Sequence, residues 1–515
     1  MLAKAKEEWT VDEAAHLMRR AGFGGSPDEI RRVHAMGRAA AVESYLKPSE
    51  AIDAFPMPSW ADPEATIAGT KNSFSKLREA KMAANRDSSK EAQNRLKMQQ
   101  QEVQRESRRQ GFEAQGWWFD RLMKSEAPLR EKMVIFWHDH FATSLQKVKR
   151  PALLMRQNQM FREHSFGDFK SLTHAVLMDP AMMLYLDTQT SVKGKPNENF
   201  AREVMELFTL GEGNYGEDDI KEAARAFTGY RFDRRNGKGV HGRYRWDDGE
   251  KTIFGKTGKF DGDQVIDLLF EQQAASEYVP TKLWKYFVED EPPEAITKRL
   301  AKVFRESGFK IEPVLREIFL SRAFYDNTVV RNQIKSPIQF LVQMARELGL
   351  DELPRGYVAT AQIQLGQVLF MPPNVAGWDW GKAWINTNTL LGRYNIAGLI
   401  TKGSASTGPM DEGGGDDMMM AMTKDVKGPM ARLMQSGTKD WEGPDYDKLA
   451  PRTLRENPEK LVNELTDRLF QAELGSKQSE AFLAFAKELK GAVFTNHEVA
   501  ELCHLMMSTP HYQLA

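Results

Sequence analysis

Apolar residues recur every three to four positions along most of the chain, a spacing that predicts amphipathic helices. Near the start, Thr10 and Glu13 have the spacing of a capping box in front of one such helix. Ser26 and Pro27 then predict the start of a second helix, with proline at its first position. We therefore expect a compact N-terminal helical unit over residues 1–46.

The helical pattern continues beyond this unit. Residues 111–400 should form the main helical core with the polar motifs, and residues 440–515 a C-terminal helical region. Residues 230–256 differ, because apolar and polar side chains alternate there and turn pairs such as Asn236-Gly237 interrupt them. The pattern predicts a mainly α protein, a multi-helix globular bundle with a small β-hairpin or three-strand element near residues 230–256.

Two segments have the character of insertions. Residues 71–110 are highly charged and poor in apolar side chains, which predicts an exposed helix or helical hairpin, a charged helical insertion. A basic arm for nucleic acid is the alternative, weakened because acidic residues are interspersed and Phe74 is the segment's one aromatic residue. Residues 403–428 are rich in Gly and Met and predict a mobile, low-complexity insertion.

Length and charge narrow the classes of protein. A chain of 515 residues exceeds what one compact core usually holds, so we expect two or three packed subdomains. Lys and Arg total 71 against 72 Asp and Glu, and this near balance gives no reason to expect nucleic acid as a partner. No apolar window approaches the roughly 20 residues of a membrane span. No signal peptide is visible at the start, so we expect a cytoplasmic location by default.

Several cofactor classes lack their sequence motifs. The single cysteine, Cys503, excludes an intramolecular disulfide and a Cys-rich metal site. The chain has no C-x-x-C-H motif for c-type haem, no Walker A loop and no dinucleotide fingerprint. The cofactor is therefore unknown, and a divalent metal held by carboxylates and histidines remains open.

A polar stripe follows the helix that we predict over residues 198–210. Asn199, Arg202, Glu203 and Glu206 share one helical face at positions i, i+3, i+4 and i+7. An arginine between two carboxylates suits a fixed ion-pair network, and carboxylates one turn apart also suit metal binding or acid–base catalysis. The alternative is a solvated helix face with an internal ion pair.

Two histidines and a polar loop are further candidates. His138 and His140 could share a metal with Glu203 and Glu206 only if their helix ends between them, since i and i+2 point to different sides. The alternative is one histidine at a site and one in a structural role. The loop from Asp187 to Asn199 offers binding groups that include Asp187, Asn197 and Asn199, unless it is an ordinary surface loop.

Tryptophans gather in a loop that glycine and proline make irregular. Trp378, Trp380 and Trp384 follow the letters PPNVAG of residues 372–377. Such a cluster can stack against sugars, aromatic groups or peptide, and we take Trp378 and Trp384 as binding candidates. A packed corner of the fold is the alternative, because Trp also buries a large area.

Six segments together resemble a large bacterial family known as domain of unknown function 1800. They read HLMRRAGFG (16–24), LREKM with FWHDHFATS (129–144), GKPNENFARE (194–203), ELFTLG (206–211), AARAFTG (223–229) and PPNVAGW (372–378). The resemblance runs in order from about residue 10 to the end of the chain. It implies no particular activity. It does imply that export is an option, and that an operon-encoded protein resembling sulfatases and alkaline phosphatases is a candidate partner.

Two functions are compatible with these features. The first is a metal-assisted hydrolase or oxidase with a buried carboxylate/His/Arg site, built from Glu203, Glu206, Arg202 and His138. The alternative is a non-catalytic binding or assembly partner of an exported sulfatase-like protein or of a polysaccharide.

Overall fold

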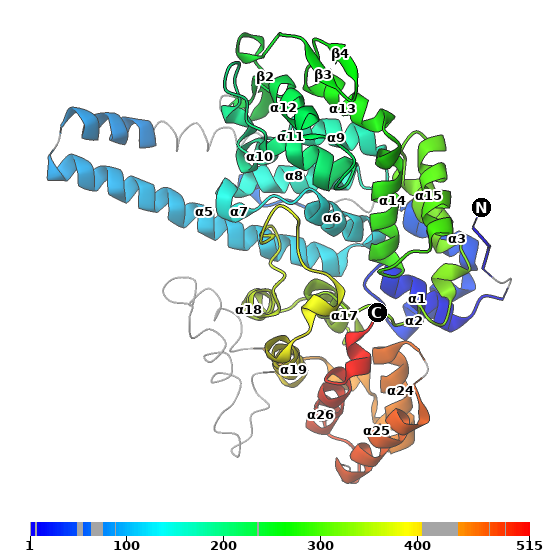
Figure 1. Cartoon of the computed structure of the whole chain (residues 1–515). Coiled ribbons are helices and arrows are strands. Elements are labelled where there is room, and N and C mark those ends of the chain that lie inside the picture. The colour runs from blue at the N-terminus through cyan, green and yellow to red at the C-terminus, as the bar shows by residue number, and fades with distance from the viewer. Residues whose placement is uncertain are drawn as a thin grey trace.

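The computed structural model describes nearly the whole chain, and helices dominate it (Figure 1). The described residues are 2–5, 8–48, 55–62, 76–87, 89–233, 236–403, 441–472, 474–489 and 491–515. The predicted insertion 403–428 lies outside them except for its first residue. The mainly α fold class is confirmed. Buried apolar side chains form one large continuous cluster that extends from Leu17 to Tyr512. The predicted division into domains stays a prediction.

The N-terminal unit has the two helices that the capping signals predicted, followed by a third. They are α1 (Val11–Ala21), α2 (Pro27–Ala35) and α3 (Arg38–Leu46). Thr10 and Glu13 form a reciprocal capping box at the first, and Ser26 and Glu29 form another at the second. These short-range hydrogen bonds explain why the starts of both helices could be predicted.

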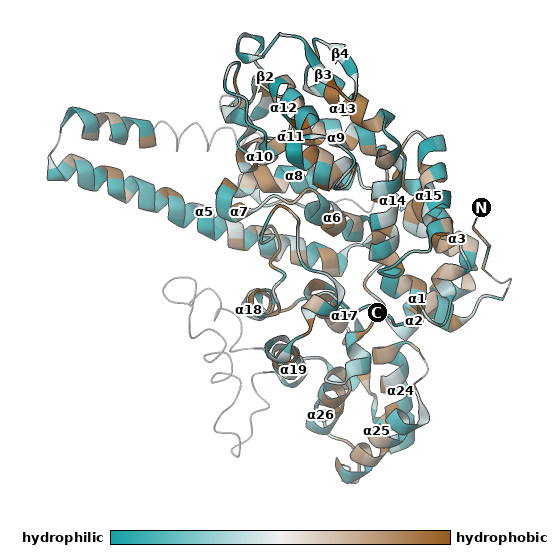
Figure 2. Ribbon diagram, in the orientation of Figure 1, coloured by the Kyte–Doolittle hydropathy of each residue, from teal (hydrophilic) through white to brown (hydrophobic). Residues whose placement is uncertain are grey.

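Helix α5 (Lys90–Lys124) unites the charged insertion with the core. Its first half and a second helical segment, residues 76–86, project away from the other helices (Figure 1) and are mostly hydrophilic (Figure 2). Its second half enters the core, where Trp118 is fully buried. Residues 76–86 and 90–110 are helical. Residues 71–75 and 88 lie outside the description, and the segment's status as an insertion stays a prediction.

The central helices follow α5 and pack around the main cluster. They are α6 (Pro128–His140), α7 (Leu145–Val148), α8 (Pro151–Glu163), α9 (Phe169–Leu177), α10 (Pro180–Tyr185), the short helix η3 (Thr188–Thr190), α11 (Asn199–Glu203), the π-helix η4 (Val204–Thr209) and α12 (Glu217–Ala226). The helix expected over 198–210 thus changes from α to π halfway along, a difference from the prediction that alters which side chains share a face.

The β element consists of two separate antiparallel hairpins. Strands β1 (Tyr230–Asp233) and β2 (Lys238–His241) form one, and β3 (Lys251–Ile253) and β4 (Lys256–Gly258) form the other. The predicted small β element is therefore confirmed, as two hairpins and not one three-stranded sheet. The second hairpin turns at Phe254 and Gly255, which both have positive φ angles, as a tight hairpin turn requires.

The remaining helices complete the fold. They are η5 (Arg243–Arg245), α13 (Gly262–Glu271), α14 (Gln273–Phe287), α15 (Glu294–Glu306), α16 (Ile311–Phe319), η6 (Ala323–Tyr325), α17 (Pro337–Glu347), α18 (Arg355–Leu365), η7 (Gly381–Trp384), α19 (Thr387–Lys402), α22 (Tyr446–Leu449), α23 (Arg452–Arg455), α24 (Pro458–Phe470), α25 (Ser476–Leu489), α26 (Asn496–Met507) and η8 (Pro510–Gln513). Figure 1 places α24–α26 at the end of the molecule opposite the β hairpins. Within the described residues, none of these helices combines the length and apolarity that crossing a membrane requires.

Candidate functional site

A cavity of about 300 Å³ lies where several distant parts of the chain meet. The N-terminal unit contributes Arg20, helix α6 contributes Lys132 and Asp139, and the end of α14 contributes Tyr286. Residues 371–384, which we call the Trp loop, contribute a further wall with Trp378, Trp380 and Trp384. We call this space the Trp cavity. Its lining combines aromatic surface with buried charge, a combination typical of ligand sites.

Asp139 holds the Trp loop in place. One of its carboxylate oxygens accepts a hydrogen bond of 2.7 Å from the backbone N–H of Trp378. The other accepts one of 2.9 Å from the indole N–H of Trp380. The approach is so close that a Cβ on Gly377 would lie 2.3 Å from Asp139 Oδ1, and Gly377 also has a φ of +94°. Only glycine fits there without displacement.

The Asp139 carboxyl has an unusual acidity. Burial raises its pKa from 3.8 to about 6, against the opposing effects of the Lys282 charge and of the hydrogen bonds from the loop. Burial in turn lowers the pKa of Lys282, and Asp139 opposes that shift. A carboxyl that titrates near neutral pH on a cavity wall can exchange a proton with a bound molecule.

Lys132 has a structural role in the cavity wall. Its ammonium group donates hydrogen bonds of 2.7–2.9 Å to the carbonyl oxygens of Arg19, Arg20 and Gly22, at the C-terminal end of α1. Three donors thus meet three acceptors, so the side chain caps α1 and is saturated. Burial lowers the pKa of Lys132 well below its ordinary value, with a further contribution from Arg20.

Arg20 is the less satisfied cation of the wall. Its side chain is 2% exposed, and its Nη2 donates to the carbonyl oxygen of Val288, just past the end of α14, and to Asn332 Oδ1. Its Nε and Nη1 are buried and have no hydrogen-bond partner among the described residues. Burial lowers the pKa of the guanidinium to about 9, although the charges of Asp290 and Glu289 oppose this.

The two tryptophans predicted as binding residues both line the Trp cavity. Trp378 is 4% and Trp384 6% exposed, so most of each indole packs against protein. The indole N–H of Trp378 is buried and has no acceptor in the described part of the chain. The loop therefore combines the two readings of the sequence: it is a packed corner whose inner face borders a cavity.

His138 lies outside the cavity, in an aromatic enclosure. The rings of Trp118, Phe161 and Phe370 surround it at 4.6–5.4 Å between centroids. Asn158 Nδ2 donates to its Nε2 over 3.1 Å. Burial, and then the charge of Arg162, lowers the pKa of His138 well below the ordinary value, which keeps the ring neutral.

Asn158 connects His138 to a buried ion-pair network. Arg162 donates to Asn158 Oδ1 and through two nitrogens to Glu131, which also pairs with Arg121 at 2.7 Å. Burial alone would raise the pKa of Glu131, and the two guanidinium groups outweigh it and hold the pKa below its ordinary value. The network is closed and fully paired, so it fixes α6 against α5 and α8.

His140 supports the π-helix. Its Nε2 donates a 2.9 Å hydrogen bond to the carbonyl oxygen of Phe208, inside η4. Tyr278 donates to the neighbouring carbonyl of Leu207 over 3.0 Å. Burial lowers the pKa of His140 well below its ordinary value, with Lys282 as the second cause. A π turn leaves carbonyl groups without their usual partners, and these two side chains supply replacements.

The polar stripe of the sequence does not form the predicted network. Arg202 pairs outward, with Glu217 through two nitrogens at 2.9 and 3.0 Å and with Glu198 at 3.3 Å. Glu206 instead accepts a hydrogen bond from Tyr215. Glu203 is half-buried, and its pKa is raised by burial first and by the Glu206 charge second.

The predicted polar loop lies at the surface and is braced by its own residues. Asp187 pairs with Lys147 at 2.7 Å and has a left-handed backbone with φ of 58°. Asn197 accepts from the backbone N–H of Asn199 through its side chain, and Asn199 is exposed. These groups and the stripe do not border the Trp cavity, and their binding roles stay predictions.

Three of the four residues predicted as metal ligands are held by different partners. His138 and His140 bond to different helices, and Glu206 bonds to a tyrosine, as described above. No group of three or more His, Cys, Asp or Glu side chains in the described ranges is placed to hold a metal ion. The metal prediction for His138, His140, Glu203 and Glu206 thus lacks a common site in this part of the structure.

The comparison that decides the family covers nearly the entire chain. The family model with the description "Protein of unknown function (DUF1800)" matches residues 16–514. The chain belongs to this family. No curated protein and no solved structure matches this chain.

Within this DUF1800 protein, the segments that carried the resemblance fall into two spatial groups. The segments 16–24, 129–144 and 372–378 meet at the Trp cavity, through Arg20, Asp139 and Trp378. The segments 194–203, 206–211 and 223–229 lie around the π-helix and the β hairpins. His140 links the groups, because it belongs to the first and bonds to the second.

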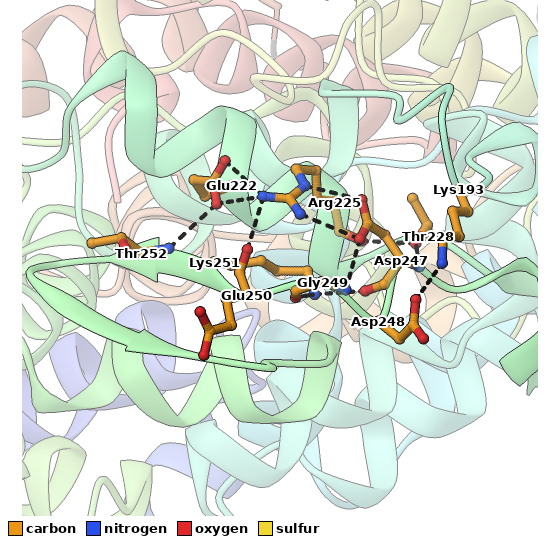
Figure 3. A network of polar contacts seen from close by, with 10 residues as sticks. All are labelled: Lys193, Glu222, Arg225, Thr228, Asp247, Asp248, Gly249, Glu250, Lys251 and Thr252. Atoms are coloured by element: carbon orange, nitrogen blue, oxygen red, sulfur yellow. Dashed lines mark hydrogen bonds and ion pairs between the residues drawn. The ribbon is translucent and has the colours of Figure 1, made fainter.

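The second group contains a structural network, which Figure 3 shows. Arg225 donates to Asp247 at 2.9 Å, to Glu222 at 2.8 Å and to the carbonyl oxygen of Glu250 at 3.0 Å. Thr228 joins the same turn by accepting from the backbone N–H of Asp247. The guanidinium of Arg225 thus bonds both to its own helix α12 and to the segment just before β3. The segment 223–229 therefore anchors the second hairpin.

Several cavity residues were missing from the sequence prediction. Arg20, Lys132 and Asp139 belong to segments that carried the family resemblance, yet their roles depend on partners more than a hundred residues away. Tyr286 and Trp380 lie next to each other, with ring centroids 5.1 Å apart. The clue in the sequence was the charge within apolar surroundings at HLMRR, LREKM and FWHDHF, since buried charges need specific partners.

Proposed function

We propose that the Trp cavity is a binding site for one small molecule and that the protein acts by binding that molecule. The observation that carries the proposal is the convergence of three separate family segments on one cavity with aromatic and charged walls. The walls come from elements that are fixed by buried hydrogen bonds, such as those of Asp139 and Lys132. Sites preorganised in this way bind without a large ordering cost.

The size of the cavity favours a single small ligand. Its volume of about 300 Å³ is at the lower end of the roughly 300–1,000 Å³ that ligand pockets span. A stretch of polysaccharide would need a longer groove. If the ligand is a polysaccharide, as predicted, this cavity has room only for a single sugar unit or a chain end. Trp378 and Trp384 offer flat surfaces on which a ring can pack.

A second function, acid–base catalysis on the bound molecule, is favoured by Asp139. Its pKa of about 6 lets both protonation states exist near neutral pH, which a general acid or base requires. This version keeps the predicted enzyme but moves its catalytic carboxyl from Glu203 and Glu206 to Asp139. Proton counting tests it: calorimetric titration of a bound ligand in buffers of different ionisation enthalpy should show proton exchange in the wild type and none in Asp139→Asn.

The other predicted functions have less support. A metal-assisted hydrolase or oxidase would need its four predicted ligands in one place, and three of them, His138, His140 and Glu206, bond to different partners. The sulfatase-like partner stays a prediction.

A cavity-filling variant tests the proposed binding function. Ile334 borders the cavity, and Ile334→Trp should occupy part of it. Ile363, 54% exposed on α18, is not among the cavity residues and provides the matched control Ile363→Trp. Each protein is incubated with a small-molecule cell extract, separated from it, and denatured for mass spectrometry. The wild type and the control should enrich the same compounds, and Ile334→Trp should not. Enrichment of nothing by the wild type, or equal enrichment by all three proteins, contradicts the proposal.

A further inference from the structure

We infer that the molecule in the Trp cavity carries an anionic oxygen group, and that Arg20 is the residue that recognises it. The inference rests on the proposed binding function and adds the chemical class of the ligand. Its basis is the supply of hydrogen-bond donors and acceptors in the cavity wall, which is unbalanced toward donors.

The unsatisfied atoms of the lining residues are mainly donors. Arg20 has Nε and Nη1 without partners, and Trp378 has its indole nitrogen without one, among the described residues. The corresponding surplus acceptor is Gln339 Oε1. An arginine carries five N–H groups, and the two acceptors of Nη2 leave the three on Nε and Nη1 unmatched. These donors are buried in residues that line the cavity, so a ligand that reaches them must offer acceptors.

The partners of the two cations Lys132 and Arg20 also favour a ligand with acceptors. Lys132 donates all three of its N–H groups to backbone carbonyl oxygens at the end of α1, so no donor of this side chain is available to a ligand. Arg20 forms no ion pair with any carboxylate of the described chain within 4.0 Å, although Glu289 and Asp290 also border the cavity. Asp290 and Glu289 therefore act on Arg20 through space only. A buried guanidinium that no carboxylate contacts directly is costly unless an anion joins it.

The chemistry of the guanidinium selects oxyanions. Hydrogen bonds from arginine to carboxylate, sulfate or phosphate oxygens are charge-assisted and roughly twice as strong as neutral ones. Trp378, Trp380 and Trp384 lie along the same cavity and can pack against an apolar ring. The combination describes a compact ligand with a ring on one side and an oxyanion on the other.

Matched aromatic probes test the inference. Benzoate, phenyl sulfate and phenyl phosphate share a phenyl ring and differ in the oxyanion, and benzamide is the neutral counterpart of benzoate. Isothermal titration calorimetry on the full-length protein measures each affinity. We expect at least one charged probe to bind ten-fold or more tightly than benzamide, and the best of the three identifies the oxyanion.

Variants assign the effect to Arg20. The Arg20→Gln substitution should reduce the preference for the charged probe at least ten-fold. Arg393 provides the matched control, because it is equally buried, donates to backbone and amide oxygens, and does not border the cavity. Arg393→Gln should keep the preference. If Arg20→Gln fails to fold, the comparison of charged and neutral probes on the wild type still decides whether the cavity prefers an anion.

The outcomes separate this inference from the proposed function. Equal affinity for benzamide and all charged probes overturns anion recognition and leaves the cavity as a binding site. A preference for charged probes that survives Arg20→Gln overturns the role of Arg20. If none of the probes binds, the inference is overturned, and the proposed function falls with it only if the wild type also enriches nothing from the extract.

Discussion

Replacing Asp139 by asparagine should change how the stability of the protein depends on pH. The structure raises the pKa of this carboxyl from 3.8 to about 6, so the folded protein binds the proton more tightly than the unfolded chain. Stability contributed by this group therefore increases as the pH falls through that range. The shift of about two units corresponds to roughly 3 kcal/mol between full ionisation and full protonation.

The substitution has two opposing effects at neutral pH. It removes the buried charge, which relieves about 3 kcal/mol. It also turns one carboxylate oxygen into an amide N–H₂ that cannot accept from the indole of Trp380, at a cost of roughly 1.5–3 kcal/mol for a lost hydrogen bond to a charged group. We therefore expect Asp139→Asn and the wild type to have similar stability at pH 7.5. At pH 4 the wild type should be more stable by roughly 2–3 kcal/mol.

Urea unfolding followed by tryptophan fluorescence at both pH values measures this difference. Groups that do not interact with Asp139 titrate alike in both proteins, so the change in the difference reports on this carboxyl together with its neighbour Lys282. Asp379→Asn, which replaces an exposed aspartate of the same loop, controls for the loss of a negative charge. A wild-type advantage that stays constant from pH 7.5 to pH 4 would refute the raised pKa.

Three further predictions concern the supports of the fold. Gly377→Ala should lower the stability by at least about 2 kcal/mol, since the new Cβ meets the clamping carboxylate and φ is +94°. Gly194→Ala is its control, with a φ of +81° but nothing within 4 Å. Glu131→Gln should cost about 3–5 kcal/mol because it removes the negative charge that two buried guanidinium groups share, while Glu113→Gln at an exposed pair should cost less than about 1 kcal/mol. His174→Asn should lose less than about 1 kcal/mol, and only at low pH, because hydrogen bonds to carboxylates of α13 raise the pKa of the imidazole.

The measurements are thermal or urea unfolding of each pair under the same conditions. Equal costs for both alanine variants would mean that the Trp loop is not packed against α6 as described. A cost for Glu131→Gln as small as that of its control would contradict a closed buried network. The stabilising contribution of His174 is fully present below pH 6.5 and is lost as the pH rises through the higher folded-state pKa. A difference that grows at high pH would contradict the ion pairs.

The sequence predicted best the features that neighbouring residues determine. Thr10 with Glu13 and Ser26 with Glu29 satisfy the first N–H groups of their own helices, so three residues suffice to recognise each start. The small β element near 230–256 likewise follows from alternation and turn residues. Arg225 of α12 bonds to Asp247 and to the carbonyl oxygen of Glu250, in the segment between the two hairpins, and no local pattern reveals that contact.

The π-helix interrupts the α-helical spacing from which the polar stripe was predicted. It begins at Val204, and within it Glu206 accepts from Tyr215, while Glu203 still lies within range of the charges of Glu206 and Arg202. The turn is supported by His140, more than sixty residues earlier in the chain. Periodicity carries no information about such distant partners.

The candidate site was predicted only in part for the same reason. The aromatic loop with Trp378 and Trp384 stands out in the sequence by composition. The residues that turn it into a cavity wall, Asp139 and Arg20, come from helices that pack against it only in the folded protein. Long-range packing decided the location of the site.

The most direct test of the central claim is an experimental electron-density map of the wild-type protein after exposure to a small-molecule extract. The account predicts density for a bound molecule inside the Trp cavity, in contact with Trp378 and with its oxygen atoms near Arg20. A cavity that contains only water, in protein that retains its fold, would contradict it.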